Sequence, residues 1–176
     1  MAQDLRYPIG AFEPVQTLTD ERRAACIAQI RDAPACLSAA VAGLKPAQLD
    51  TPYRPGGWTV RQLVHHVADS HMNAFMRFKL ALTENEPTIK TYEEALWAEL
   101  ADTKTPSIEP SLAILENLHM RWVILLRALG PRDWPRRFRH PQWGLTTVDF
   151  LLAQYAWHGR HHVAHVTSLR ERSRWQ

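Results

Sequence analysis

The chain has 176 residues, of which 45% are hydrophobic and 22% charged, as is typical of one globular domain with its own core. Its net charge is only +3 and its arginines form no stripe along one helix, which argues against nucleic acid as a partner. No run approaches 18 apolar residues and the first residues lack an apolar signal core, so we expect a cytoplasmic protein without a membrane partner.

The first predicted elements are an arm and a helix. Residues 1–18 contain two prolines and a glycine and are predicted to form an extended N-terminal arm. A helix then starts at Thr19, a hydroxyl cap followed by acidic residues, and runs to about residue 41. Pro34 is expected to bend this helix or to end it early, and residues 49–57 are expected to form a loop.

The rest of the chain is also predicted to be helical. A second helix starts at the capping box of Thr59 and Gln62 and continues to about residue 83. Further helices are predicted over 92–100, over 111–129, and from Thr146 or Thr147 to about residue 170. The long loop 131–145 gives no predictable sheet. These patterns predict an all-α fold, a single-domain four-helix bundle with long connecting loops that spans residues 1–176.

Histidines are concentrated in two segments of the predicted helices. Four of the nine lie in residues 157–165, and three lie in residues 64–71. Two histidines four residues apart on one helix face can direct two imidazole nitrogens at the same metal ion. A third histidine from another helix would complete three protein ligands and leave a coordination position open. This arrangement is typical of catalytic rather than structural metal sites.

The last helix offers two such pairs, His158/His162 and His161/His165. At about 100° per residue, His162 falls about 40° from His158 on the face that also carries Leu151, whereas polar residues lie opposite. The first pair is better centred on this inward face, so we predict His158 and His162 as ligands. The alternative for any one inward histidine is a core imidazole that is hydrogen-bonded to a backbone carbonyl.

The second helix carries a polar stripe that consists of Gln62, His66, Asp69, Ser70, Asn73 and Arg77. Two interpretations remain open: the stripe is a solvent-exposed face, or it is one wall of a wet pocket that meets the last helix. In the second interpretation His66 is a ligand. Asp69, one turn away, then either orients the ring of His66 or is a solvated charge. His65 and His71 lie off the stripe and are weaker candidates.

Segment 58–73, which reads WTVRQLVHHVADSHMN, resembles the second helix of the DinB superfamily, in particular its YfiT-like branch. The likeness extends to YPIG at 7–10, LDTPYR at 49–54, RFKL at 77–80 and WHGRHHVAH at 157–165. It covers nearly the whole chain. The resemblance implies a four-helix bundle that forms homodimers. Members of the branch are described as proposed metal-dependent hydrolases, and the branch includes bacillithiol S-transferases.

The resemblance also implies a ligand set. In this family one histidine of the second helix and an H-x-x-x-H pair of the last helix hold the metal, which matches His66, His158 and His162 here. Gly159 is a departure, because a glycine inside a ligand-bearing helix costs about 1 kcal/mol relative to alanine. We expect it to permit the close approach of a neighbouring helix.

The expected cofactor is one divalent ion per chain, zinc or nickel. The leading hypothesis is a metal-dependent S-transferase that joins a low-molecular-weight thiol, such as bacillithiol, to an electrophilic small molecule. The alternative is a metal-dependent hydrolase with a small-molecule substrate, and an alternative of another class is a non-catalytic metal- or ligand-binding bundle. The sequence identifies no catalytic residue. Candidates to bind an anionic thiol or substrate are Arg54, Arg77 and Arg121.

Overall fold

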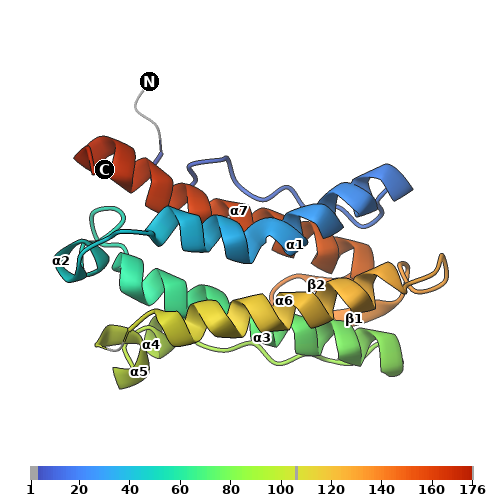
Figure 1. Cartoon of the computed structure of the whole chain (residues 1–176). Helices are drawn as coiled ribbons and strands as arrows, with labels where there is room; N and C mark the ends of the chain where they lie inside the picture. Colours follow the sequence, from blue (N-terminus) through green and yellow to red (C-terminus); the bar gives the residue numbers. More distant parts are fainter. Residues whose placement is uncertain (1–3, 106, 176) are drawn as a thin grey trace.

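A computed structural model describes residues 4–105 and 107–175 and has four long helices as its main elements (Figure 1). These helices are α1 (Asp20–Val41), α3 (Val60–Thr83), α6 (Glu109–Arg127) and α7 (Val148–Ser173). Both α1 and α3 pack against α6 and against α7, so the four helices enclose one common interior. The prediction of a four-helix bundle is confirmed.

Short elements connect the long helices. They are α2 (Pro46–Leu49), α4 (Glu94–Trp97), α5 (Ala101–Lys104), β1 (Arg137–His140) and β2 (Gly144–Thr147). The segment predicted as one short helix over 92–100 therefore contains α4 alone, and α5 follows it.

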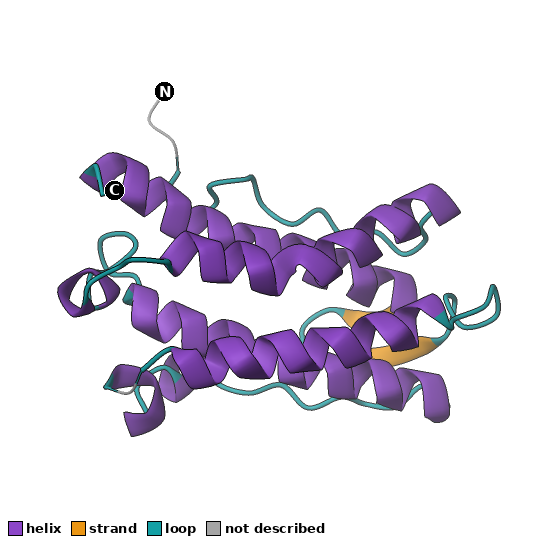
Figure 2. Ribbon diagram, viewed as in Figure 1, coloured by secondary structure: helices purple, strands orange, loops and turns teal. Residues whose placement is uncertain are grey.

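The mostly helical fold also contains one small antiparallel hairpin, formed by β1 and β2 at one end of the bundle (Figure 2). Strand β1 and the first half of β2 fall in the segment 131–145, which is predicted as an irregular loop, and β2 continues into the predicted helix cap at Thr146 and Thr147. Phe138 pairs with Thr146 and is fully buried, and Gly144 takes the positive φ of 69° that the turn requires. Two strands of four residues are too short for a clear alternation of polar and apolar positions.

The helix starts follow the capping chemistry of the sequence. The hydroxyl of Thr19 accepts a hydrogen bond from the backbone N–H of Arg22, and Thr147 caps α7 in the same way. Thr59 and Gln62 form the predicted capping box of α3. Pro34 does not end α1, which continues through it to Val41.

The interior has a polar layer between two apolar clusters. One cluster is built around Phe78, Trp122 and Leu151, and the other around Leu63 and Val166. Along α3, α6 and α7 the residues between the two clusters include histidines, and on α1 the corresponding stretch includes Pro34. The candidate site lies in this layer.

The N-terminal arm, as far as it is described, runs along α7 as an extended segment (Figure 1). The indole N–H of Trp157 donates to the carbonyl of Gly10, and Phe12 packs against Trp157 and Phe150. Among the described residues, no helix is both long and apolar enough to cross a membrane.

Candidate metal centre

Three histidines from two helices converge in the polar layer. His66 of α3 and His158 and His162 of α7 each offer one ring nitrogen, and these nitrogens all lie within 4.8 Å of one another. The Nε2 atoms of His158 and His162 are 3.2 Å apart. Two nitrogens bound to a tetrahedral zinc with bonds of about 2.0 Å would lie roughly 3.3 Å apart. The described part of the chain contains no second group of this kind.

The helices dictate this convergence. His158 and His162 are one turn apart on α7, and α7 packs against α3, which carries His66 in its first half. The ring of Trp58, just before the cap of α3, lies over the His66 ring with centroids 4.5 Å apart. His66 and His162 are buried, and His158 is partly exposed.

Burial keeps the three imidazoles neutral. It lowers the pKa of His66 to about 4. Burial, followed by the neighbouring imidazoles, also lowers the pKa values of His158 and His162 far below their usual range. Neutral rings present lone pairs, which a metal ion needs. The Nδ1 atom of His162 is buried and has no hydrogen-bond partner among residues 4–105 and 107–175. The donor set therefore fits a divalent cation.

The competing pair on α7 does not join this group. His161 stacks on Trp157 with centroids 4.2 Å apart. His165 lies against Tyr53, and its Nε2 is 3.2 Å from the backbone carbonyl oxygen of Arg6. Both rings are buried, and His165 matches the alternative of a core imidazole that is hydrogen-bonded to a backbone carbonyl.

The polar stripe of α3 is not a solvent-exposed face. Gln62, Ser70 and Arg77 are buried with His66, and Asp69 and Asn73 are half-buried. The segment with α4 and α5 covers one end, where the side-chain amide of Gln62 donates to the carbonyl of Ala98 over 2.7 Å. The stripe thus forms a wall inside the protein, as the second interpretation requires.

Asp69 does not orient His66 through a hydrogen bond, since none joins the two side chains within the described residues. Its half-buried carboxyl instead has a pKa raised to about 6, chiefly by burial and then by the charge of Asp102. Such a carboxyl can exchange a proton near neutral pH.

Of the three candidate arginines, only Arg77 is buried. It donates to the hydroxyl of Tyr155 over 3.3 Å and to the carbonyl of Lys90 over 3.2 Å. Arg54 is half-buried, and Arg121 is exposed and lies over the ring of Phe75.

Two further histidines lie next to the site: His71, a weaker candidate by its helix angle, and His119, which no sequence pattern singles out. His71 is fully buried, with its Nε2 atom 3.1 Å from Nδ1 of His158 and its Nδ1 atom 2.7 Å from Nε2 of His119. Helix angles place His71 off the stripe, and no sequence spacing links His119 of α6 to α3. Only the pairing of the helices brings the two rings together.

Comparison with known proteins adds independent information. A family model described as the DinB superfamily matches residues 29–166. A proposed metal-dependent hydrolase of Bacillus mycoides (strain KBAB4) is 56% identical over 98% of this chain and 99% of its own. A protein of Bacillus cereus (strain ATCC 10987 / NRS 248) with the same description is 55% identical over the same shares of the two chains.

Solved structures agree with this result. YfiT from Bacillus subtilis, described as a proposed metal-dependent hydrolase with an unusual four-helix bundle topology, superposes with a TM-score of 0.95. It is 47% identical, and the match covers 98% of this chain and 99% of that one. With the family model over most of its length and relatives of this identity over nearly all of it, the chain belongs to the DinB superfamily and is YfiT-like.

Proposed function

We propose that the protein is a metal-dependent hydrolase of the YfiT type, with one divalent ion held by His66, His158 and His162. The observation that carries the proposal is the convergence of three neutral ring nitrogens within 4.8 Å. Zinc and nickel both accept imidazole ligands. The descriptions of the relatives favour a hydrolase over the thiol S-transferase that the sequence led us to expect first.

The ligand residues make the site asymmetric. The tilted ring of Trp58 packs against the buried His66, with centroids 4.5 Å apart, whereas His158 is partly exposed. Three neutral ligands leave the full charge of a divalent ion uncompensated, so the site favours an anionic fourth partner. When bound, the ion supplies Lewis acidity and a lowered pKa to a water or thiol ligand.

Two residues of the α3 wall are proposed to act on the substrate. Asp69, with its pKa near 6, takes up a proton at its carboxylate oxygen during hydrolysis. Arg77 attracts an anionic substrate group. It is a buried cation that forms no ion pair with a carboxylate among the described residues, and its partner Tyr155 lies next to His158, with centroids 5.5 Å apart.

The first experiment measures metal in protein purified without a histidine tag. We expect about one zinc or nickel ion per chain after reconstitution, and most of the affinity lost in His66→Ala, His158→Ala and His162→Ala. His161→Ala is the matched control on α7 and should bind normally. Less than about 0.2 ions per chain in the parent protein would contradict the proposal.

The second candidate function is the thiol S-transferase. The uncompensated charge of a three-imidazole site favours it, because a thiolate is an anionic ligand that zinc and nickel both accept. Holo protein, chelated protein and His158→Ala should be compared on simple esters and amides, and on a bacterial low-molecular-weight thiol with an electrophilic dye. Hydrolysis by the holo form alone supports the hydrolase, and conjugation by the holo form alone supports the transferase. Bound metal without either activity supports a binding bundle.

A further inference from the structure

A chain of hydrogen bonds leads from the candidate metal centre through the interior of the bundle to the backbone of α1. Nδ1 of His158 lies 3.1 Å from Nε2 of His71, and Nδ1 of His71 lies 2.7 Å from Nε2 of His119. Nδ1 of His119 lies 2.5 Å from the backbone carbonyl oxygen of Ile30. The four members come from α7, α3, α6 and α1, one from each long helix.

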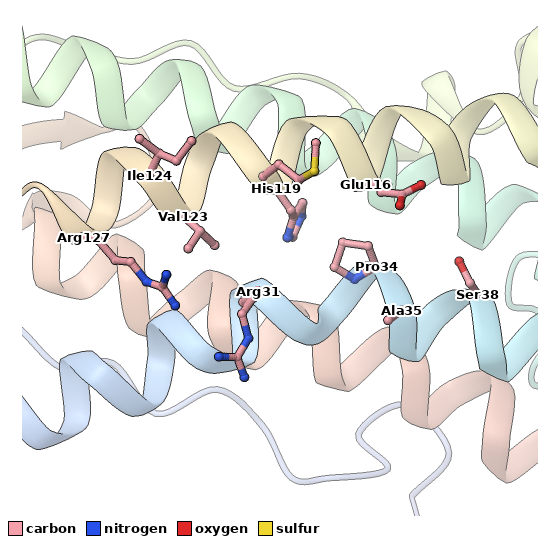
Figure 3. Close-up of a pocket in the computed structure, with 10 residues that line it drawn as sticks. Arg31, Pro34, Ala35, Ser38, Glu116, His119, Val123, Ile124 and Arg127 are labelled. Atoms are coloured by element: carbon pink, nitrogen blue, oxygen red, sulfur yellow. The ribbon is translucent and has the colours of Figure 1, made fainter.

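The carbonyl at the end of this chain is available because of a proline. In a regular helix the carbonyl of Ile30 would accept from the N–H of residue 34, but Pro34 has no N–H. Nδ1 of His119, on α6, donates to this carbonyl instead. Figure 3 shows the His119 ring pointing from α6 toward α1, beside Pro34.

The carbonyl also fixes the direction of every bond in the chain. A carbonyl oxygen can only accept, so Nδ1 of His119 carries a proton. Burial lowers the pKa of His119 to about 4, so the ring is neutral and its Nε2 accepts from Nδ1–H of His71. The His71 ring is fully buried, where a second proton would be costly, and its one proton is on Nδ1, so its Nε2 accepts in turn from Nδ1–H of His158. The Nε2 atom of His158 is then left as a lone pair that faces Nε2 of His162.

We propose that His71 and His119 are positioning residues that fix His158 as the tautomer with a proton on Nδ1 and an unprotonated Nε2 for the metal ion. The inference rests on the proposed metal site but assigns two residues outside the ligand set. The second ring nitrogen of a ligand histidine sets its tautomer and ring orientation, and here another histidine supplies the acceptor.

The packing holds this chain in one arrangement. The ring of His71 meets the edges of Trp122 and Tyr155, with centroids 5.8 and 5.4 Å away. Gly159 lies beside the ring, since a Cβ atom built on it would be in van der Waals contact with Cε1 of His71 at 3.7 Å. Both His71 and His119 are at most 2% exposed, so little water can compete for their nitrogens.

The direct test observes the tautomers in the unmodified protein. The zinc-loaded protein, labelled with ¹⁵N at histidine, should give two-bond ¹H–¹⁵N correlations that show His71, His119 and His158 all protonated at Nδ1. A His158 ring protonated at Nε2, or a His71 ring protonated at Nε2, would overturn the proposal whatever any variant does.

Variants add a second readout, the zinc dissociation constant measured by competition with a chromophoric chelator. His71→Leu and His119→Leu should weaken zinc binding about 10- to 100-fold, the range typical of lost partners behind a ligand. His71→Gln places an amide oxygen near the position of Nε2 and should restore most of the affinity. His161→Leu removes a buried imidazole that is not part of the hydrogen-bond chain, so this variant should bind zinc as tightly as the parent does.

The two proposals can fail separately. A parent protein that binds no zinc contradicts the proposed function. If the parent binds zinc and the folded His71→Leu variant binds it with the same affinity, only the positioning role is contradicted. Equal loss in His71→Leu and His71→Gln would also contradict it, because packing and not hydrogen bonding would then explain the effect. If the leucine variants do not fold, the tautomers of the parent decide.

Discussion

The half-buried carboxyl of Asp69 is a residue where stability and the proposed activity conflict. Its folded-state pKa of about 6 lies above the ordinary 3.8, so the fold binds the proton more tightly than the unfolded chain does. The contribution of Asp69 to the free energy of unfolding is therefore most favourable below pH 3.8, where the carboxyl is protonated in both states. It is lost as the pH rises through 6. A residue retained at such a cost is a candidate for function.

Asp69→Asn should accordingly stabilise the metal-free protein at pH 8. The gain is on the order of 1 kcal/mol, less than the full pKa shift implies because the side chain is only half-buried. Urea unfolding at several pH values measures it, and the gain should shrink as the pH falls from 8 to 5. A gain that does not change with pH would show that the effect is not due to the charge. Hydrolysis by the holo protein should fall in the same variant.

Helix α7 packs closely against α1 at Gly159. A Cβ atom at this position would lie 3.0 Å from Cβ of Ala33, which is tied to its own helix backbone and cannot turn away. This confirms the expectation that the glycine permits close helix packing next to His158.

Gly159→Ala is therefore expected to destabilise the protein by about 1 kcal/mol or more, even though alanine is the better helix former by about 1 kcal/mol. Thermal unfolding of the single and double variants checks the reason. Ala33→Gly in the Gly159→Ala background should recover part of the loss, although Ala33→Gly alone costs stability. If Gly159→Ala stabilises the protein, α1 can move to accommodate the added methyl group, and the contact between position 159 and Ala33 does not restrict packing.

The elements also explain which features the sequence could predict. Helix period and capping residues are local signals, so the four long helices and the starts at Thr19, Thr59 and Thr147 were predictable. The angle around α7 is also a local signal, so it distinguished the pair His158/His162 from the pair His161/His165.

Features that depend on two helices at once were not predictable. Asp149 falls on the polar side of α7 by angle, yet it is buried and pairs with Arg23 of α1 over 2.7 Å. The bond from His119 to the carbonyl of Ile30 likewise requires knowledge of which helix faces Pro34. The projection of a single helix contains no such information. The proposed metal ligands could therefore be predicted, but His71 and His119, which form the hydrogen-bond chain to His158, could not.

For the whole molecule, we propose a homodimer, as the family resemblance implies. On α1, the apolar residues Ile30, Leu37 and Val41 are buried in the core. Large apolar side chains are exposed elsewhere: Ile124 is 72% exposed and Met120 is 59% exposed, both on α6. Light scattering should give twice the 20.2 kDa of one chain, and Ile124→Lys should lower the mass. A parent mass near 20.2 kDa at micromolar concentration would contradict a dimer.

The layer of buried histidines makes the whole fold sensitive to acid. Folded-state pKa values of about 4 for His66 and His119 lie below the 6.5 of a free imidazole, so the unfolded chain binds more protons as the pH falls. The stability that these rings contribute is fully present above pH 6.5 and is lost as the pH falls toward 4. Each shift corresponds to about 3 kcal/mol at most, against a typical total of about 5–15 kcal/mol.

The metal-free protein should therefore unfold cooperatively between pH 6.5 and 4, although few of its carboxylates are in buried ion pairs. The zinc-loaded protein should unfold at lower pH, because an ion that binds only the folded state stabilises it by mass action. Circular dichroism at 222 nm during acid titration of both forms measures the two midpoints. A metal-free form that stays folded to pH 3 would mean that the buried imidazoles accept protons without loss of the fold. Coincident midpoints would mean that zinc is not bound by the native histidine layer.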